Sequence, residues 1–403
     1  MTRRWLSILG IGEDGVETLS PAARALLSGA ALVVGGARHL ALADRLITGA
    51  RLAWPSPLSD AFPAILARRG EAVVVLASGD PYCFGVGASL ARIVPPEETL
   101  CLPAPSAFSL ACARLGWAAQ EVAQLSFCGR PLEAVLPRLQ PGARLLALSA
   151  DATTPAALAA LLRAHGFGPS RLWLLESLGG PRERVRVCTA EDGPPEGIDP
   201  LNLVAMEVVA APGARIIPLA CGLPDALFEH DGQITKREIR AMTLATLAPL
   251  QGEMLWDIGC GSGSISIEWM LRHPANRAVA LDERTDRASR AARNAASLGV
   301  PGLKVITGAA PVALTGLPTP DAVFVGGGAT RQGVLETAWA ALRPGGRMVV
   351  NAVAVETEAV LIGQQRRLGG SLTRIAVEHL EPLGPMRGFR PARTVTQWVG
   401  VKA

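Results

Sequence analysis

The chain has 403 residues, of which 49% are apolar and 18% charged, and its formal net charge at pH 7 is +4. This length predicts two or three domains with substantial cores, and the composition excludes a fibrous or low-complexity chain. The apolar runs are strand-length, so we expect no membrane span, and the small net charge argues against binding to nucleic acid. Because the first ten residues lead into a Gly-rich loop and not into an apolar stretch, we expect no secretory signal and a cytoplasmic location.

The cysteines and the basic residues limit the chemistry further. The seven cysteines are an odd number and form neither a C-x-x-C pair nor a Cys/His cluster with zinc-ligand spacing, so we expect reduced thiols and no metal. Of the 39 basic residues only Lys236, Lys304 and Lys402 are lysines. Arginine binds carboxylates through two parallel hydrogen bonds, which would suit a polyanionic substrate, although codon bias is the plainer explanation.

The first half reads as alternating strands and helices. A strand over 5–9 enters a Gly-rich loop over 10–15, and a helix then begins near Ser20, with Ser20 as N-cap and Pro21 at the first helical position. Further strands are predicted at 31–34, 72–77, 125–128, 144–148, 171–175 and 203–209.

Residues 210–224 are rich in Pro and Gly and have no clear period, which is typical of a linker. We therefore expect a first domain over 1–212, a linker over 213–222 and a second domain over 223–403.

The α/β pattern restarts after the linker. Strands separated by single helices predict a parallel sheet with right-handed crossovers. Helices are expected at 235–247, 264–271, 286–297 and 331–342, and strands at 254–257, 278–282, 304–307, 322–325 and 347–350.

A Gly-rich loop over 255–263 ends the first of these strands and opens a helix, which is where a parallel sheet binds its ligand. Gly259, Gly261 and Gly263 form G-x-G-x-G, whereas a dinucleotide site would need glycine where Ser264 stands. Glycines allow the backbone to approach the methionyl group of S-adenosylmethionine, and the helix N-terminus offers N–H groups to its carboxylate. Asp282, at the end of the next strand, is placed to accept from the ribose hydroxyls. The residues expected to contact this cofactor are Asp257, Gly259, Cys260, Gly261, Ser262, Gly263 and Asp282.

With the L-R-P-G-G turn at 342–346, the order of these motifs resembles the class I methyltransferases, which have a Rossmann-like fold. Three peptides of the first half, at 8–12, 76–85 and 103–107, resemble the tetrapyrrole methylases, which bind the same cofactor on an unrelated two-lobed α/β fold. The resemblance implies cofactor contacts from Gly10, Gly12, Gly79, Asp80 and Ser106. The third peptide departs from the pattern, because Ala104 and Ala107 stand where Gly and Ser are usual.

Taken whole, the chain is similar to the bifunctional, decarboxylating precorrin methyltransferases of cobalamin biosynthesis. This resemblance implies two S-adenosylmethionine sites, one per domain, methylation of precorrin-6B at C5 by the first half, and methylation at C15 with loss of the C12 acetate carboxyl in the second, giving precorrin-8X. It also implies cofactor contacts from Thr235 and Ala310, with Ala309 replacing an Asp. Cys128 stands where relatives often have His, so any role of that histidine is absent here.

The helix start at Thr235-Lys-Arg-Glu238 reads as a capping box, with Thr235 as N-cap. Lys236 and Arg240 are then exposed helix charges, although Lys236 is also a candidate to bind a substrate carboxylate and is our first catalytic candidate. His230 is a candidate proton shuttle, with a surface or capping role as the plainer reading.

Asn351 and Glu356 follow a strand at its carboxyl end, where catalytic groups collect, and complete the catalytic candidates. Asp80 either acts as a base or holds its turn, and we favour the turn.

The alternative to a tetrapyrrole enzyme is an S-adenosylmethionine-dependent RNA methyltransferase with a fused second methylase domain. The low charge and the absence of a basic tract interleaved with aromatic residues argue against it. We expect a small tetrapyrrole as partner, no nucleic acid, no membrane, and a homo-oligomer.

Overall fold

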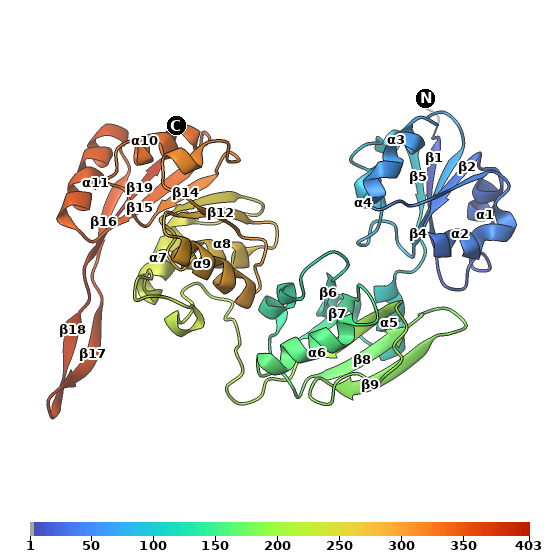
Figure 1. The fold of residues 1–403 in the computed structure, drawn as a ribbon, viewed down its shortest axis with the longest axis horizontal. Coiled ribbons are helices and arrows are strands. Elements are labelled where there is room, and N and C mark those ends of the chain that lie inside the picture. The colour runs from blue at the N-terminus through green and yellow to red at the C-terminus, as the bar shows by residue number, and fades with distance from the viewer. Residues whose placement is uncertain (1–3) are drawn as a thin grey trace. The chain divides into compact units, whose positions relative to one another are not determined.

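The computed structural model describes residues 4–403, which form two compact units (Figure 1). The first unit runs to Leu132 and resumes over Gln140–Arg215, and the second comprises Glu133–Leu139 and Ile216–Ala403.

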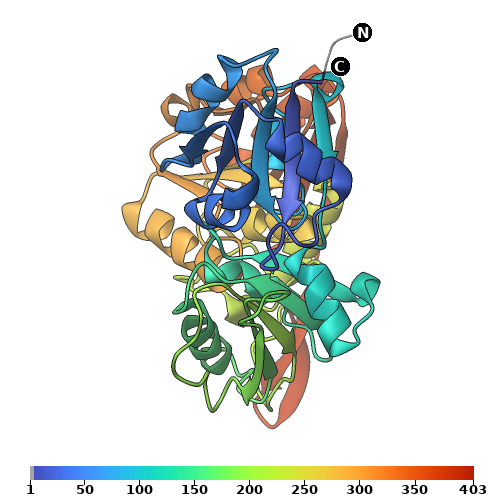
Figure 2. The same ribbon diagram turned by 90° about the vertical axis from the view of Figure 1, so that its right-hand side faces the viewer.

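The first lobe of the first unit is an all-parallel sheet in the order β3-β2-β4-β1-β5, whose blue strands lie side by side in Figure 2. The inner strand β1, between β4 and β5, is buried on both faces, with Leu6 and Ile8 in one core and Leu9 and Ile11 in the other, as is typical of parallel sheets. The strands are β1 (Leu6–Ile11), β2 (Leu32–Gly35), β3 (Ala50–Ala53), β4 (Val73–Ser78) and β5 (Thr99–Leu102). The helices are α1 (Pro21–Ser28), α2 (Ala37–Ala43), α3 (Phe62–Leu66) and α4 (Gly87–Leu90). Ser20 caps α1 as predicted, because its side chain accepts from the Ala23 N–H at 3.2 Å.

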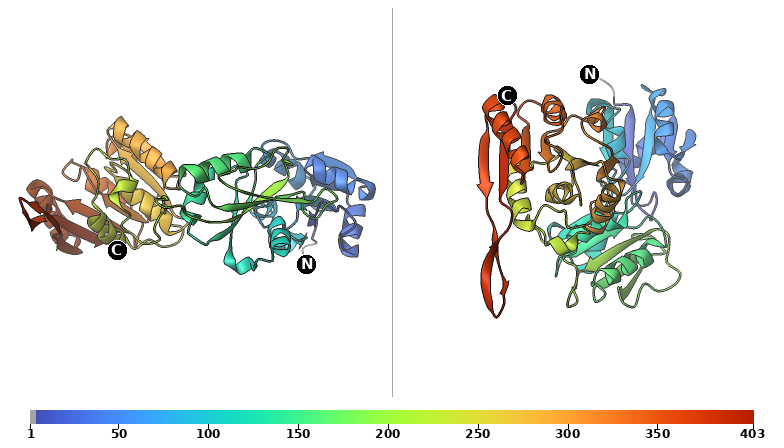
Figure 3. Two further views of the ribbon diagram at one scale, coloured as in Figure 1. Left: turned by 90° about the horizontal axis from the view of Figure 1, so that it is seen from below. Right: turned by 60° about the vertical axis from the view of Figure 1, so that its left-hand side comes forward.

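The second lobe of this unit is a mixed sheet in the order β6-β7-β10-β8-β9, in which only β6 and β7 are parallel. Its strands are β6 (Val122–Ser126), β7 (Arg144–Leu148), β8 (Arg171–Glu176), β9 (Arg184–Thr189) and β10 (Asn202–Glu207), with helices α5 (Ala107–Leu115) and α6 (Thr154–Ala164). The lobe is seen from below in the left panel of Figure 3.

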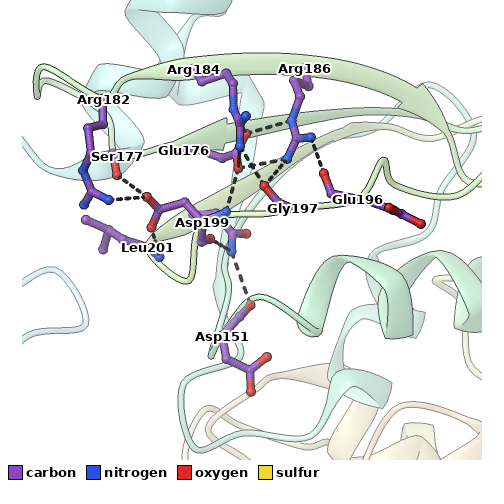
Figure 4. A network of polar contacts seen from close by, with 11 residues as sticks. Asp151, Glu176, Ser177, Arg182, Arg184, Arg186, Glu196, Gly197, Asp199 and Leu201 are labelled. Atoms are coloured by element: carbon purple, nitrogen blue, oxygen red, sulfur yellow. Dashed lines mark hydrogen bonds and ion pairs between the residues drawn. The ribbon is translucent and has the colours of Figure 1, made fainter.

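A network of hydrogen bonds and ion pairs joins β8 to the edge strand β9 of this lobe (Figure 4). The Glu176 carboxylate is buried at the end of β8, and Arg184 and Arg186 from β9 each donate two hydrogen bonds to it. The Asp199 backbone N–H donates to the same carboxylate at 2.7 Å. Burial alone would raise the pKa of Glu176, but these donors outweigh it and lower the pKa to about 2.

The second unit is a seven-stranded sheet in the order β13-β12-β11-β14-β15-β19-β16. Five strands are parallel, as predicted, whereas β19 runs antiparallel to both β15 and β16. The strands are β11 (Met254–Ile258), β12 (Arg277–Asp282), β13 (Lys304–Thr307), β14 (Ala322–Val325), β15 (Arg347–Ala352), β16 (Ser371–Ile375) and β19 (Val395–Val401). The helices are α7 (Arg237–Leu247), α8 (Ser264–Arg272), α9 (Thr285–Ser297), α10 (Val334–Ala341) and α11 (Val355–Leu368).

Between β16 and β19 the chain forms a separate hairpin of β17 (Glu378–Leu383) and β18 (Met386–Pro391), which we call the arm. The arm projects away from the sheet of its unit as a twisted ribbon (Figures 1 and 3). Short 3-10 helices occur at Asp44–Leu46, Leu58–Ala61, Pro96–Glu98, Ala119–Glu121, Leu132–Arg138, Asp225–Leu227 and Val312–Leu314.

Candidate functional site

In the first unit the three peptides singled out in the sequence come together. Gly10 lies in β1, and the Ala104 N–H donates to the Gly79 carbonyl at 3.1 Å. A Cβ on Gly10 would overlap both the Gly79 carbonyl oxygen and the Ala104 nitrogen, so only glycine fits there. The loop after β1, the loop after β4 and the turn before α5 therefore form one contiguous backbone surface.

The polar side chains at this junction have structural partners. The Asp80 carboxylate accepts from the Tyr82 N–H at 2.9 Å, which is the turn-holding role that we favoured. Ser106 is the N-cap of α5 and accepts from the Ser109 N–H at 3.1 Å. Asp14 lies beside Gly12, and its Oδ1 is buried without a hydrogen-bond partner among residues 4–403. That unpaired acceptor fits a ligand with N–H or O–H groups seated on this surface.

The second unit contains a cavity of about 1140 Å³ at the carboxyl edge of its sheet. Gly259, Cys260 and Gly261 from the loop after β11 line it, together with Asp282 and Ala310. Cavities that bind drug-sized ligands have volumes of roughly 300–1,000 Å³. The cavity can therefore hold S-adenosylmethionine together with part of a second molecule.

The backbone of the Gly-rich loop explains its glycines. Gly259, Gly261 and Gly263 have φ values of +72°, +57° and +75°, the left-handed region that side chains disfavour. A Cβ on Gly259 would also lie 2.8 Å from the Gly327 nitrogen, so the loop passes too close to its neighbour for any side chain.

Asp282 lies at the end of β12 with its side chain buried against the loop. One carboxylate oxygen accepts from the Gly261 N–H and the other from the Arg284 N–H, each at 3.0 Å. Each oxygen keeps a further lone pair, so a cavity-lining Asp282 can hold the loop and still accept from ribose hydroxyls.

Asp257, Ser262 and Gly263 do not line the cavity, unlike their neighbours. The Asp257 carboxylate is buried beneath the loop and accepts from the Ser266 hydroxyl at 2.6 Å, so it holds the start of α8. Burial raises the pKa of Asp257 to about 6. The Ser262 hydroxyl is buried without a hydrogen-bond partner among the described residues, and it does not reach the cavity lining.

The four catalytic candidates divide into two pairs. Lys236 and Asn351 line the cavity, whereas His230 and Glu356 do not. The Asn351 side chain is held by Thr243 at 3.0 Å and by Gln397 at 2.9 Å. His230 accepts from the Gly232 N–H at 3.1 Å, which is a loop-holding role, and Glu356 is exposed in the first turn of α11.

Two expectations for the start of α7 are wrong. The helix begins at Arg237 with Lys236 as N-cap and no side-chain cap, so Thr235 lines the cavity without closing a capping box. Arg240 is fully buried and not exposed, because it pairs with Glu268 at 2.5 Å and with Asp225 at 3.1 Å. The pattern could have revealed this, since Arg240, Thr243, Leu244 and Leu247 have the i, i+3, i+4, i+7 spacing of a buried stripe.

Comparison with known proteins agrees with the geometry. The model of the tetrapyrrole (corrin/porphyrin) methylases matches residues 6–193, and that of the precorrin methyltransferase domain matches residues 226–402. A precorrin-6Y C(5,15)-methyltransferase [decarboxylating] from Sinorhizobium sp. is 55% identical over 99% of this chain and 96% of its own length. The chain belongs to the precorrin-6Y C(5,15)-methyltransferase family.

A member of this family from Mycobacterium tuberculosis is 42% identical over 97% of the chain and 98% of its own length. A shorter relative, a probable cobalt-precorrin-6B C(15)-methyltransferase (decarboxylating) from Saccharolobus solfataricus, is 34% identical over 37% of this chain and 77% of its own length. Membership of a methyltransferase family makes the chain dependent on S-adenosylmethionine and gives no support to the RNA methyltransferase alternative. No helix among residues 4–403 is both long and apolar enough to cross a bilayer.

Proposed function

We propose that this chain methylates precorrin-6B at C5 and C15 and releases the C12 acetate carboxyl as CO2, giving precorrin-8X, with one S-adenosylmethionine site in each unit. The observation that carries the proposal is that each unit has its own candidate cofactor site, built from Gly-rich loops. One is the junction of Gly10, Gly79 and Ala104, and the other is the cavity beneath Gly259 and Gly261.

In the second unit the chain's own residues supply positioning. The loop backbone and the N-terminus of α8 would hold the methionyl group, and Asp282 would hold the ribose. When bound, the cofactor supplies an electrophilic methyl group. The meso carbons of a reduced, conjugated tetrapyrrole are enamine-like nucleophiles, so the cavity has to hold such a carbon in line at roughly 3 to 3.5 Å from the methyl.

Decarboxylation needs an electron sink, which a protonated or iminium-like macrocycle provides. The cavity wall then has to exclude water from the departing carboxyl, since a carboxylate in a dry site is less stabilised than one in water. Ile258, Ile265, Phe324 and Val353 give part of this wall an apolar character.

We assign C5 methylation to the first unit, and C15 methylation with decarboxylation to the second. The shorter relative from Saccharolobus solfataricus, whose name gives both the C15 methylation and the decarboxylation, matches 77% of its own length to only 37% of this chain. That name therefore assigns both reactions to a polypeptide about the size of one unit.

The test is mass spectrometry of the product made by full-chain variants. Gly261→Arg places a large side chain in the cavity, and we expect a product that has gained one methyl and kept its carboxyl. Gly10→Val places a side chain where the Gly79 and Ala104 backbones approach Gly10 in the first unit. We expect this variant to make a product that has gained one methyl and lost CO2. Release of CO2 at the normal rate by Gly261→Arg would contradict the assignment, and S-adenosylmethionine binding at the intact unit controls for folding.

We further propose that the chain is a homo-oligomer of the cytoplasm. The arm exposes Leu380, Leu383, Met386 and Phe389, with Leu380 directly opposite Phe389. An isolated two-stranded hairpin is at best marginally stable in water, so a second copy of the chain that covers these side chains would stabilise it. All seven cysteines are free thiols, which suits a reducing compartment.

A further inference from the structure

The cavity of the second unit extends along the carboxyl edge of the sheet, well beyond the cofactor loop. Asp282 ends β12, Gly259 follows β11, Asn351 lies in β15, and Val395 begins β19, and all four line the cavity. In the strand order β12-β11-β14-β15-β19 the first and last of these strands are four spacings apart, which is roughly 19 Å at about 4.8 Å per spacing. The far end of the cavity is therefore separate from the cofactor loop.

The base of the arm forms the wall at that far end. Val377, His379, Ala392 and Arg393 line the cavity there, and the Ala392 N–H donates to the Val377 carbonyl at 2.9 Å, which closes the base. Val377 also packs against the apolar cluster of Ile239, Ile375 and Val395, so the base is fixed to α7 and to the sheet. The wall is therefore anchored, in contrast to the projecting end of the arm.

Arg393 is the cation of this wall that has no internal partner. Three other cavity-lining arginines are occupied, because Arg287 pairs with Asp231, Arg331 pairs with Glu283, and Arg237 donates to the Gly222 carbonyl at 3.0 Å. Within residues 4–403 no ion pair or hydrogen bond is formed by the Arg393 side chain. An arginine that lines a cavity with its donors unused can receive a carboxylate through two parallel hydrogen bonds.

We propose that Arg393 binds a carboxylate side chain of the tetrapyrrole in the second unit, and that this carboxylate is one that the product retains. The proposal rests on the proposed function and specifies which residue of this chain orients the macrocycle. Arg393 acts here as a positioning residue and takes no part in bond making.

The chemistry of decarboxylation decides which carboxylate Arg393 can serve. An ion pair with the departing carboxylate would stabilise the reactant and be lost as CO2 forms, so it would raise the barrier. An ion pair with a retained carboxylate is equally strong before and during the reaction. It would therefore lower KM without changing kcat, while fixing which edge of the macrocycle faces the methyl donor.

The test compares Arg393→Gln with Arg387→Gln in the full chain. Arg387 is a fair control, because it is an exposed arginine of the same arm that lies opposite Pro382 and does not line the cavity. For Arg393→Gln we expect KM for the tetrapyrrole in the decarboxylating step to rise by about 10- to 100-fold, in line with the loss of a charge-assisted hydrogen bond. We expect kcat and the affinity for S-adenosylmethionine to be unchanged, Arg393→Lys to recover part of the loss, and Arg387→Gln to match the unmodified chain.

Three results would overturn the inference. They are an unchanged KM in Arg393→Gln, an equal rise in Arg387→Gln, and a rise in kcat together with KM in Arg393→Gln, which would place Arg393 at the departing carboxyl. Failure of the proposed function itself is distinguishable, because then the unmodified chain would release no CO2 from the tetrapyrrole.

Discussion

Asp282 connects the Gly-rich loop to the next strand through hydrogen bonds from the Gly261 and Arg284 N–H groups. Replacing it by Ala removes these acceptors and the charged acceptor for the ribose, which is worth about 1.5 to 3 kcal/mol. We expect calorimetric titration of Asp282→Ala to show S-adenosylmethionine binding weakened at least tenfold at one site and unchanged at the other. Asp286→Ala, an exposed acid of α9 outside the cavity, is the control and should bind normally. Equal weakening in both variants would remove Asp282 from the cofactor site.

Asp257 makes the stability of the second unit depend on pH. Its pKa of about 6 lies above the value of about 3.9 in an unfolded chain, so unfolding releases a proton between these values. This contribution is fully present below pH 4 and is lost as the pH rises through 6, by up to about 3 kcal/mol. Hydrogen exchange of β11 amides should therefore show that Asp257→Asn gains protection relative to the unmodified chain between pH 4.5 and 7. A difference that does not vary with pH would show that Asp257 stays ionised.

The residues of the site differ in how far the sequence predicts them. Gly259 and Gly261 are predictable because their left-handed backbone excludes other residues, and their spacing follows from the loop itself. Arg393 is not, since it reaches the cavity only because a hairpin is inserted between two strands of the sheet. Spacing along the chain carries no information about such an insertion.

At the scale of elements, α7 and α8 are joined by a buried ion pair. Arg240 and Glu268 are both fully buried, and Glu268 also accepts from the Gly222 and Leu223 N–H groups. Arg240→Met should cost about 3 to 5 kcal/mol, because it leaves the Glu268 carboxylate buried without its cation. Adding Glu268→Gln should recover part of this loss, which calorimetry of the unfolding transition will measure. Strictly additive losses in the double variant would mean that the two side chains do not interact.

Elements with both faces buried are the ones that the sequence predicts well. The predicted bounds of β7 and β14 coincide with those observed, because apolar runs between breakers mark such strands clearly. The bounds of β13 also coincide, although β13 lies at a sheet edge and has no fully buried residue. The strands β3, β9 and β16 are at sheet edges and the arm is exposed, so burial imposes no clear alternation on them. The exception is β19, which is buried along most of its length and lies inside the sheet although the sequence analysis predicts no strand there.

At the scale of the whole molecule, the boundary between the units falls after Arg215, inside the predicted linker of 213–222. The end of that segment is part of the second unit, because the Gly222 and Leu223 N–H groups donate to buried Glu268. If the chain is cut between residues 215 and 216, we expect both fragments to bind S-adenosylmethionine in calorimetry. Division after Gly222 should weaken the second fragment, since it removes one of these hydrogen bonds. A soluble fragment without any binding would refute the two-site proposal.

The arm should determine the oligomeric state. Phe389→Asp places a charge in the exposed apolar surface of the arm, and light scattering should then report a smaller particle than the unmodified chain. Val187→Asp, at another exposed apolar strand position, should leave the particle mass unchanged. A monomeric unmodified chain would refute the homo-oligomer.

The position of β19 has a consequence for synthesis on the ribosome. This strand is the last in the chain, yet it lies inside the sheet between β15 and β16. The first unit can complete its own sheets while translation continues, because both are made entirely from residues that precede the linker. The second sheet must wait until residue 401 has left the exit tunnel, with the edge of β15 open in the meantime. A nascent chain that stalls before Val395 would therefore combine a complete set of first-unit strands with a second sheet that lacks the strand joining β15 to β16.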